Sequence, residues 1–393
     1  QRQMCIRDSI NAEVLLKHAK VRDGRLVLDG GMEYRVLVLP KLRTMRPELL
    51  DAIERMVRAG LTVLGPAPDR SPGLAGYPGA DERVKETAER MWHSGAAAKY
   101  AVYGKGRVFN DGCSLEEVFA SLSMRPDCRI EGQNTDVRFI HRTTEQGDIY
   151  FLSNQQERKV VFEAAFRTED GAPELWDALT GVVRRLPGFS RQDGVTTVPL
   201  ELDPYGSAFI VFDRTKEARQ SSAENFPEAT VLARVEGPWK VTFEGLEAPE
   251  APVVLDTLCD WTVSDDPRIR YFSGTARYET AFEVENTGSG SVCVDLGKVM
   301  VMGRVFLNGV CAGGTWTPPY RVDVSGLIRE GRNVLEVEVA NNWMNRLIGD
   351  QRLPPEQRKT WTPVNPWTAS SELQSSGLLG PVVVGKFDYE IVK

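Results

Sequence analysis

One loop near the carboxyl end of the sequence combines an aromatic ring with planar polar groups, the mixture that carbohydrate sites need. Its four candidate contact residues are Trp343, Asn345, Arg346 and Asp350. The indole could lie against a pyranose ring while the amide, guanidinium and carboxylate bind its hydroxyl groups. Alternatively, the polar side chains satisfy the loop backbone or pack domains together. Trp361 and Trp367, in a Pro-rich stretch farther along, allow the same two interpretations.

Other reactive side chains lack the spacing that catalysis or metal binding requires. His18, His93 and His141 are scattered, so we expect neither a zinc site nor a triad, and we interpret His141 as a strand residue bonded to a neighbour. The 6 cysteines form no CxxC pair and read as small buried hydrophobes, with a Cys293–Cys311 disulfide as the alternative in an exported protein. We assign no catalytic residue and leave the metal content undetermined.

Composition narrows the class of protein. The 393 residues are 41% hydrophobic and 26% charged, which is typical of soluble globular chains, and this length predicts two or three domains. The formal charge of -7, without a basic stripe, argues against a nucleic-acid partner. No apolar run is long enough to span a membrane. Residues 1–9 resemble translated sequencing adapter and are interpreted as a non-native artefact.

Residues 10–127 alternate between strand and helix patterns. Tyr34–Leu39 is an apolar, β-branched run, a helix begins near Pro47, and Leu61–Leu64 is the next strand. This βαβ unit predicts an open α/β sheet with a right-handed crossover. A capping-box pattern at Ser114 predicts the start of a further short helix.

The remaining chain shows the two-residue period of strands. Residues 128–213 predict a small antiparallel β-sandwich, and the polar residues 214–226 predict a linker. Residues 227–393 carry regularly spaced strands, with a hairpin signal at Asn308-Gly309, and predict a jelly-roll β-sandwich. The predicted fold class is therefore multidomain, α/β plus all-β.

Several spaced motifs in the last region together resemble the sugar-binding domain of glycoside hydrolase family 2. They are Trp261, Tyr271-Phe-Ser-Gly-Thr-Ala-Arg-Tyr278, Val305-Phe-Leu-Asn-Gly309, Tyr320-Arg-Val-Asp-Val324 and Val337-Glu-Val-Ala-Asn341. The stretch from Asn341 to Gln351, followed by Ser376-Gly-Leu-Leu-Gly380, resembles family 106 α-L-rhamnosidases more closely. Phe139-Ile-His-Arg142 and Glu174-Leu-Trp-Asp177 extend that resemblance into the earlier regions.

The resemblance implies an inverting hydrolase that needs calcium and uses two glutamates of a catalytic barrel as acid and base. Neither the barrel nor the two carboxylates can be mapped onto this chain. We therefore expect no cofactor in this chain, with calcium reserved for the full-length relative. The α/β region resembles the glutamine-amidotransferase-like domain that such hydrolases carry after the barrel. It shows no nucleophilic Cys at a strand-to-helix turn followed by a His, so we interpret it as structural.

These observations lead to one expected function and two alternatives. We expect the accessory carboxy-terminal region of a rhamnosidase-like glycoside hydrolase, inactive without its missing catalytic barrel. The alternatives are a free-standing carbohydrate-binding protein and a purely structural β-sandwich protein. The expected partners are an oligo- or polysaccharide and the protein's own barrel. The resemblance implies a periplasmic or extracellular location.

Overall fold

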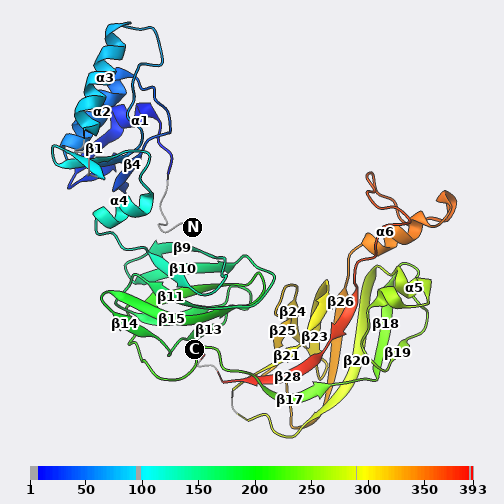
Figure 1. The fold of residues 1–393 in the computed structure, drawn as a ribbon. Coiled ribbons are helices and arrows are strands. Elements are labelled where there is room, and N and C mark those ends of the chain that lie inside the picture. The colour runs from blue at the N-terminus through cyan, green and yellow to red at the C-terminus, as the bar shows by residue number, and fades with distance from the viewer. Residues whose placement is uncertain (1–7, 94–98, 289, 389–390, 393) are drawn as a thin grey trace. The chain divides into compact units, whose positions relative to one another are not determined.

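The computed structural model describes residues 8–93, 99–288, 290–388 and 391–392. The chain is mostly β-sheet with few helices (Figure 1), which confirms the prediction of a multidomain, β-rich protein. Contacts divide the described chain into one compact unit that ends at Pro126 and another that begins at Asp127. No helix among the described residues is long and apolar enough to cross a membrane.

A four-stranded sheet with the order β4-β5-β7-β6 forms the centre of the first unit. Its strands are β4 (Val36–Val38), β5 (Thr62–Leu64), β6 (Tyr100–Tyr103) and β7 (Gly106–Phe109). β4, β5 and β7 run parallel, and β6 is antiparallel to β7. α2 (Pro47–Arg58) connects β4 to β5 and begins at Pro47 as predicted, and α3 (Gly79–Trp92) packs beside it. The predicted βαβ unit is confirmed.

The amino-terminal part of this unit differs from the prediction. α1 (Ala12–His18) leads into a small antiparallel sheet of β1 (Ala19–Arg22), β2 (Arg25–Leu28) and β3 (Glu33–Tyr34). The prediction of one strand over Tyr34–Leu39 is wrong, because Tyr34 pairs with β2 and the parallel strand is limited to β4. α4 (Leu115–Ser121) begins with the complete capping box predicted at Ser114.

Two antiparallel sheets form the middle region, with the orders β13-β12-β16-β10-β9 and β14-β15-β11-β8. Their strands are β8 (Cys128–Glu131), β9 (Val137–Thr143), β10 (Gly147–Asn154), β11 (Val160–Phe166), β12 (Ala172–Trp176), β13 (Val183–Arg185), β14 (Ser190–Gln192), β15 (Val195–Leu202) and β16 (Ser207–Asp213). Tyr150, Phe166 and Phe212 pack at the centre of its core. Residues 214–226 contain no helix or strand, but Asn225 is buried and bonded to Gly188.

The last region contains a six-stranded sheet, β19-β18-β20-β26-β23-β24, a four-stranded sheet, β17-β28-β21-β25, and the pair β22-β27. The strands are β17 (Thr230–Val235), β18 (Trp239–Gly245), β19 (Val253–Leu255), β20 (Gly274–Val284), β21 (Ser291–Asp295), β22 (Lys298–Met300), β23 (Met302–Leu307), β24 (Val310–Thr315), β25 (Arg321–Asp323), β26 (Gly331–Ala340), β27 (Gly377–Gly380) and β28 (Val382–Phe387). A short 3-10 helix, η1 (Trp261–Val263), and α5 (Pro267–Arg270) precede β20.

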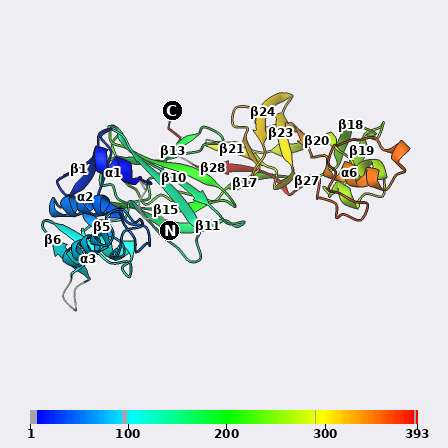
Figure 2. The ribbon, with the colours of Figure 1, turned by 90° about the horizontal axis from the view of Figure 1, so that it is seen from above.

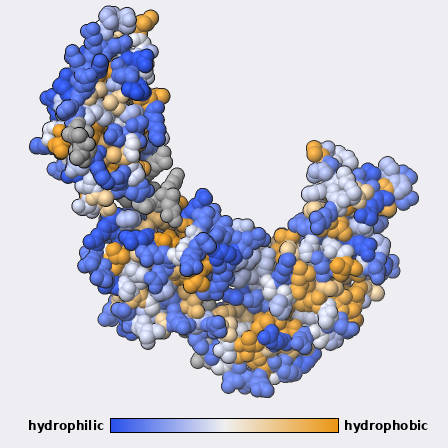
Figure 3. All heavy atoms as spheres, in the orientation of Figure 1, coloured by the Kyte–Doolittle hydropathy of each residue, from blue (hydrophilic) through white to orange (hydrophobic). Residues whose placement is uncertain are grey.

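The core of this region is one apolar cluster that includes its two most buried tryptophans, Trp239 and Trp261. The Trp261 indole N–H donates to the Tyr278 hydroxyl at 2.6 Å, so its polar edge is satisfied inside the core. Asn308 and Gly309 both have positive φ, which confirms the predicted hairpin turn between β23 and β24. Hydrophobic residues also gather on the face of this region seen in Figure 3.

Candidate functional site

The four predicted sugar-contact residues lie in the segment between β26 and β27, residues 341–376, which we call the α6 segment. It contains α6 (Met344–Gln351) and the 3-10 helix η2 (Pro355–Gln357). α6 lies over the end of the six-stranded sheet near β18 and β19 (Figures 1 and 2). Gly349 permits this close packing, because a Cβ there would lie 2.7 Å from Cγ of Tyr271. α6 therefore packs directly against Tyr271, in the connection between α5 and β20.

Asn345 fixes the return of the α6 segment to the sheet. Its side chain is buried, and its amide donates to the carbonyl of Gln374 at 2.6 Å and to the hydroxyl of Ser376 at 3.1 Å. The Gln374 N–H donates back to Asn345 Oδ1 at 2.8 Å. Each of these contacts joins two parts of the loop, so the amide of Asn345 is occupied within the protein.

Asp350 holds the far part of the α6 segment. The carboxylate is buried, and its Oδ2 accepts hydrogen bonds from the backbone N–H groups of Lys359 and Thr360, at 3.0 and 2.7 Å, and from the Thr360 hydroxyl at 2.6 Å. Its Oδ1 lies 3.0 Å from Nη2 of the buried Arg346. Arg346 Nε and Asp350 Oδ1 nevertheless have no hydrogen-bond partner among the described residues. The charge pair is thus buried with one donor and one acceptor unsatisfied, and removal of either partner would leave an uncompensated buried charge.

Glu247, in the turn after β18, completes this ion-pair network. Its carboxylate lies 3.2 Å from both the Arg346 guanidinium and the Lys359 ammonium. A hydrogen bond from Lys359 lowers the pKa of Glu247, and one from Arg346 acts in the same direction. Sequence reasoning missed Glu247 because it is 99 residues away from Arg346 and no local pattern connects them.

Trp343 differs from the other three candidates because its side chain is available to a ligand. It precedes the first residue of α6 and is 56% exposed. Trp361, directly after the anchored Thr360, is 85% exposed. An exposed indole is an apolar surface against which a sugar ring can stack. The α6 segment thus combines buried polar anchors with exposed aromatic rings.

A second polar cluster lies in the middle region around His141. His141 Nε2 lies 2.9 Å from Asp148, its ring stacks on Tyr150 at 4.1 Å, and its Nδ1 is 3.7 Å from Asp127. The interpretation of His141 as a strand residue bonded to a neighbour is confirmed. Burial by itself lowers the pKa of His141, but the two carboxylates outweigh it and raise that pKa. Burial likewise opposes ionisation of Asp127, yet His141 and Arg167 hold its pKa at about 2.

The described cysteines form no recognisable reactive site, and the expectation that the cysteines are buried is wrong for most of them, because only Cys128 is buried among those described while Cys259 and Cys311 are exposed. Cys293 and Cys311 are both free thiols, so the alternative of a disulfide between them is not realised in this structure. Cys113 lies in the turn between β7 and α4, a strand-to-helix position that the sequence reading did not recognise. Its thiol contacts the Lys99 carbonyl and the Asn110 side chain, and no histidine is among its partners in the described chain. It therefore lacks a general base.

The described residues contain no cluster of side chains arranged as a metal-binding site. The described ranges contain no group of three or more His, Cys, Asp or Glu side chains that could hold an ion. The buried carboxylate of the α6 segment, Asp350, already contacts Arg346, Lys359 and Thr360.

Comparison with known proteins relates the chain to glycoside hydrolases. A family profile described as alpha-L-rhamnosidase matches residues 6–190. The solved structure of a rhamnosidase from Novosphingobium sp. PP1Y is 33% identical, with a TM-score of 0.86 over 96% of this chain and 36% of that chain. A protein of Formosa agariphila, described as "Putative beta-glucuronidase", is 22% identical over 93% of this chain and 51% of its own length.

These similarities show that the chain is related to glycoside hydrolases. The chain spans about half the length of the curated relative and about a third of the solved rhamnosidase. The predicted relationship to rhamnosidases is confirmed in two respects. The rhamnosidase profile matches residues 6–190, and the chain shares its fold with part of the solved rhamnosidase.

Proposed function

We propose that this chain is the accessory region of an α-L-rhamnosidase-like hydrolase whose catalytic barrel lies outside it. The observation that carries this proposal is the similarity to the Novosphingobium rhamnosidase, which extends over 96% of this chain but only 36% of that protein. The amidotransferase-like, β-sandwich and sugar-binding jelly-roll identities of the three regions are part of the same proposal. Export to the periplasm or outside the cell also belongs to it.

The role of the accessory region is to present the α6 segment to a saccharide. Trp343 supplies the apolar face, and the buried Asn345, Arg346 and Asp350 act by holding the loop that carries it. Direct contact between these three polar groups and a sugar hydroxyl would require the loop to open. Exposure of Trp343 at 56% supports contact through its indole. Rhamnoside binding in the barrel would then be extended by one aromatic subsite.

Recovery of the complete reading frame from the source DNA tests the main proposal. We expect a barrel with two glutamates, positioned for acid and base catalysis, upstream of Asn11 and in frame. A start codon immediately upstream of that residue would instead favour the free-standing carbohydrate-binding protein. The exposed Trp343 is the observation that supports this second function, and saccharide binding by the chain alone would then be expected.

A further inference from the structure

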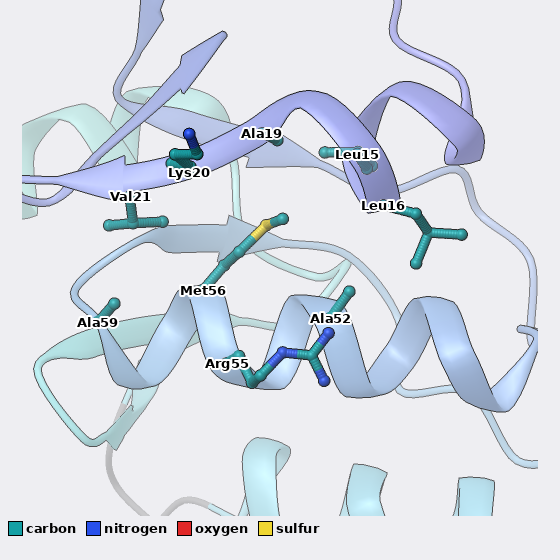
Figure 4. A pocket seen from close by; sticks show the side chains of 9 residues that line it. All are labelled: Leu15, Leu16, Ala19, Lys20, Val21, Ala52, Arg55, Met56 and Ala59. Carbon is teal, nitrogen blue, oxygen red and sulfur yellow. The ribbon is translucent and has the colours of Figure 1, made fainter. Parts of the chain in front are cut away.

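A shallow groove in the first unit takes no part in the proposed saccharide contact. It lies between α2 and the chain that runs from α1 into β1, and its volume is about 250 Å³. Met56 extends from α2 toward this chain, and Leu15 and Ala52 complete a buried apolar floor (Figure 4). Leu16 extends the apolar surface and is 39% exposed. The groove therefore has an apolar floor and is open to solvent on one side.

Two exposed cations line the same groove. Lys20 comes from β1 and Arg55 from α2, so they belong to the two walls that enclose the floor. Within the described ranges neither side chain forms an ion pair, whereas Arg58, the last residue of α2, is paired with Glu54. The chain as a whole has a formal charge of -7, whereas the groove carries two cations without ion-pair partners beside its apolar side chains. The local charge of the groove is therefore opposite in sign to the net charge of the chain.

The size and charge of the groove indicate a protein segment as its occupant. Small-molecule sites usually enclose about 300 to 1,000 Å³, so this groove is better suited to one or two apolar side chains. A carboxylate beside those side chains would pair with Lys20 and Arg55 and would steer association. The source of such a segment would be the rest of a longer protein, because most of the solved rhamnosidase lies outside the part that matches this chain.

We propose that this groove docks an acidic, apolar segment of the part of the protein that carries the catalytic barrel. The proposal rests on the proposed function, since it assumes that such a part exists. Leu15, Leu16 and Met56 receive the apolar side chains, and the two cations receive the carboxylate. Because rim charges act through solvent, the contact weakens as ionic strength rises from 0.1 M to 1 M, conditions between which the screening length falls from about 10 to about 3 Å.

Hydrogen exchange followed by mass spectrometry tests the docking. Exchange of residues 12–21 is compared between the 393-residue chain and the protein made from the complete reading frame. We expect at least a 10-fold slowing in the complete protein. The double variant Lys20→Glu/Arg55→Glu of the complete protein should return to the rate of the chain alone. The control Lys41→Glu/Lys85→Glu changes two other exposed cations and should keep the protection.

Two internal checks make the result decisive. Exchange in β7, a core strand that does not line the groove, must be the same in all variants, which shows that the unit remains folded. Equal exchange of residues 12–21 in the chain and in the complete protein overturns the docking, as does protection that survives the double charge reversal. Rhamnoside turnover is measured on the same samples. Turnover with an unprotected groove refutes the docking alone, and absence of turnover refutes the proposed function.

Discussion

Substitution of Asp350 by Ala should loosen the α6 segment without unfolding the sandwich. The change removes an acceptor of three hydrogen bonds from Lys359 and Thr360, and it leaves the buried Arg346 with Glu247 as its remaining carboxylate. Breaking a buried ion pair usually costs about 3 to 5 kcal/mol. Because Glu247 is 42% exposed but still 3.2 Å from the guanidinium, we expect the lower end, about 3 kcal/mol.

Hydrogen exchange of the Lys359 and Thr360 amides measures this effect directly, since both donate to Asp350. A loss of about 3 kcal/mol corresponds to roughly 100-fold faster exchange, at about 1.4 kcal/mol for each factor of ten. Glu356→Ala, in the exposed η2, is the matched control and should leave both rates unchanged. Rates in Asp350→Ala within threefold of the control would refute the assignment of Asp350 as the anchor of this loop.

Four further predictions concern other parts of the molecule. In the complete protein, Trp343→Ala should raise KM for a rhamnoside about 10-fold through loss of one aromatic contact. The control is Trp316→Ala, at another exposed tryptophan directly after β24, and an unchanged KM in Trp343→Ala or an equal rise in the control would contradict the prediction. Gly349→Ala places a Cβ against an aromatic ring and should destabilise the last region by about 1 to 3 kcal/mol in urea unfolding, so a neutral result would refute the packing. The raised pKa of His141 means that its contribution to stability is complete below pH about 6.5 and is lost as pH rises through the folded pKa; His141→Gln should remove this dependence in thermal melts, whereas His18→Gln should retain it. Addition of EGTA should leave the melting temperature of the chain unchanged, and a decrease would show that it binds calcium.

Local signals accounted for the parts of the fold that were predicted correctly. Pro47 starts α2, Ser114 starts α4, and Asn308-Gly309 turns the β23–β24 hairpin, because each motif satisfies backbone geometry within a few residues. The small sheet of β1, β2 and β3 was missed because its strands are only 2 to 4 residues long, too short for a two-residue period to stand out. Its pairing depends on tertiary contacts.

The structural roles of the four candidate residues could not be read from the sequence. Asn345, Arg346 and Asp350 look like surface ligands because polar side chains are usually exposed. They are buried here because Asn345 and Asp350 bond to residues farther along the α6 segment, and Arg346 pairs with Glu247, which is 99 residues away. Those long-range pairings exist only after the sandwich folds. Direct sugar contact by the four candidates therefore stays a prediction, with Trp343 the most accessible.

Rhamnose release from an α-L-rhamnoside tests the proposed rhamnosidase-like function directly. The assay compares the protein made from the complete reading frame with the 393-residue chain at equal concentration. We predict turnover by the complete protein and none above the buffer rate by the chain alone, because the proposed function places the acid and base carboxylates outside this chain. Turnover by the chain alone would place catalysis within these residues, and inactivity of a folded complete protein would contradict the rhamnosidase-like function.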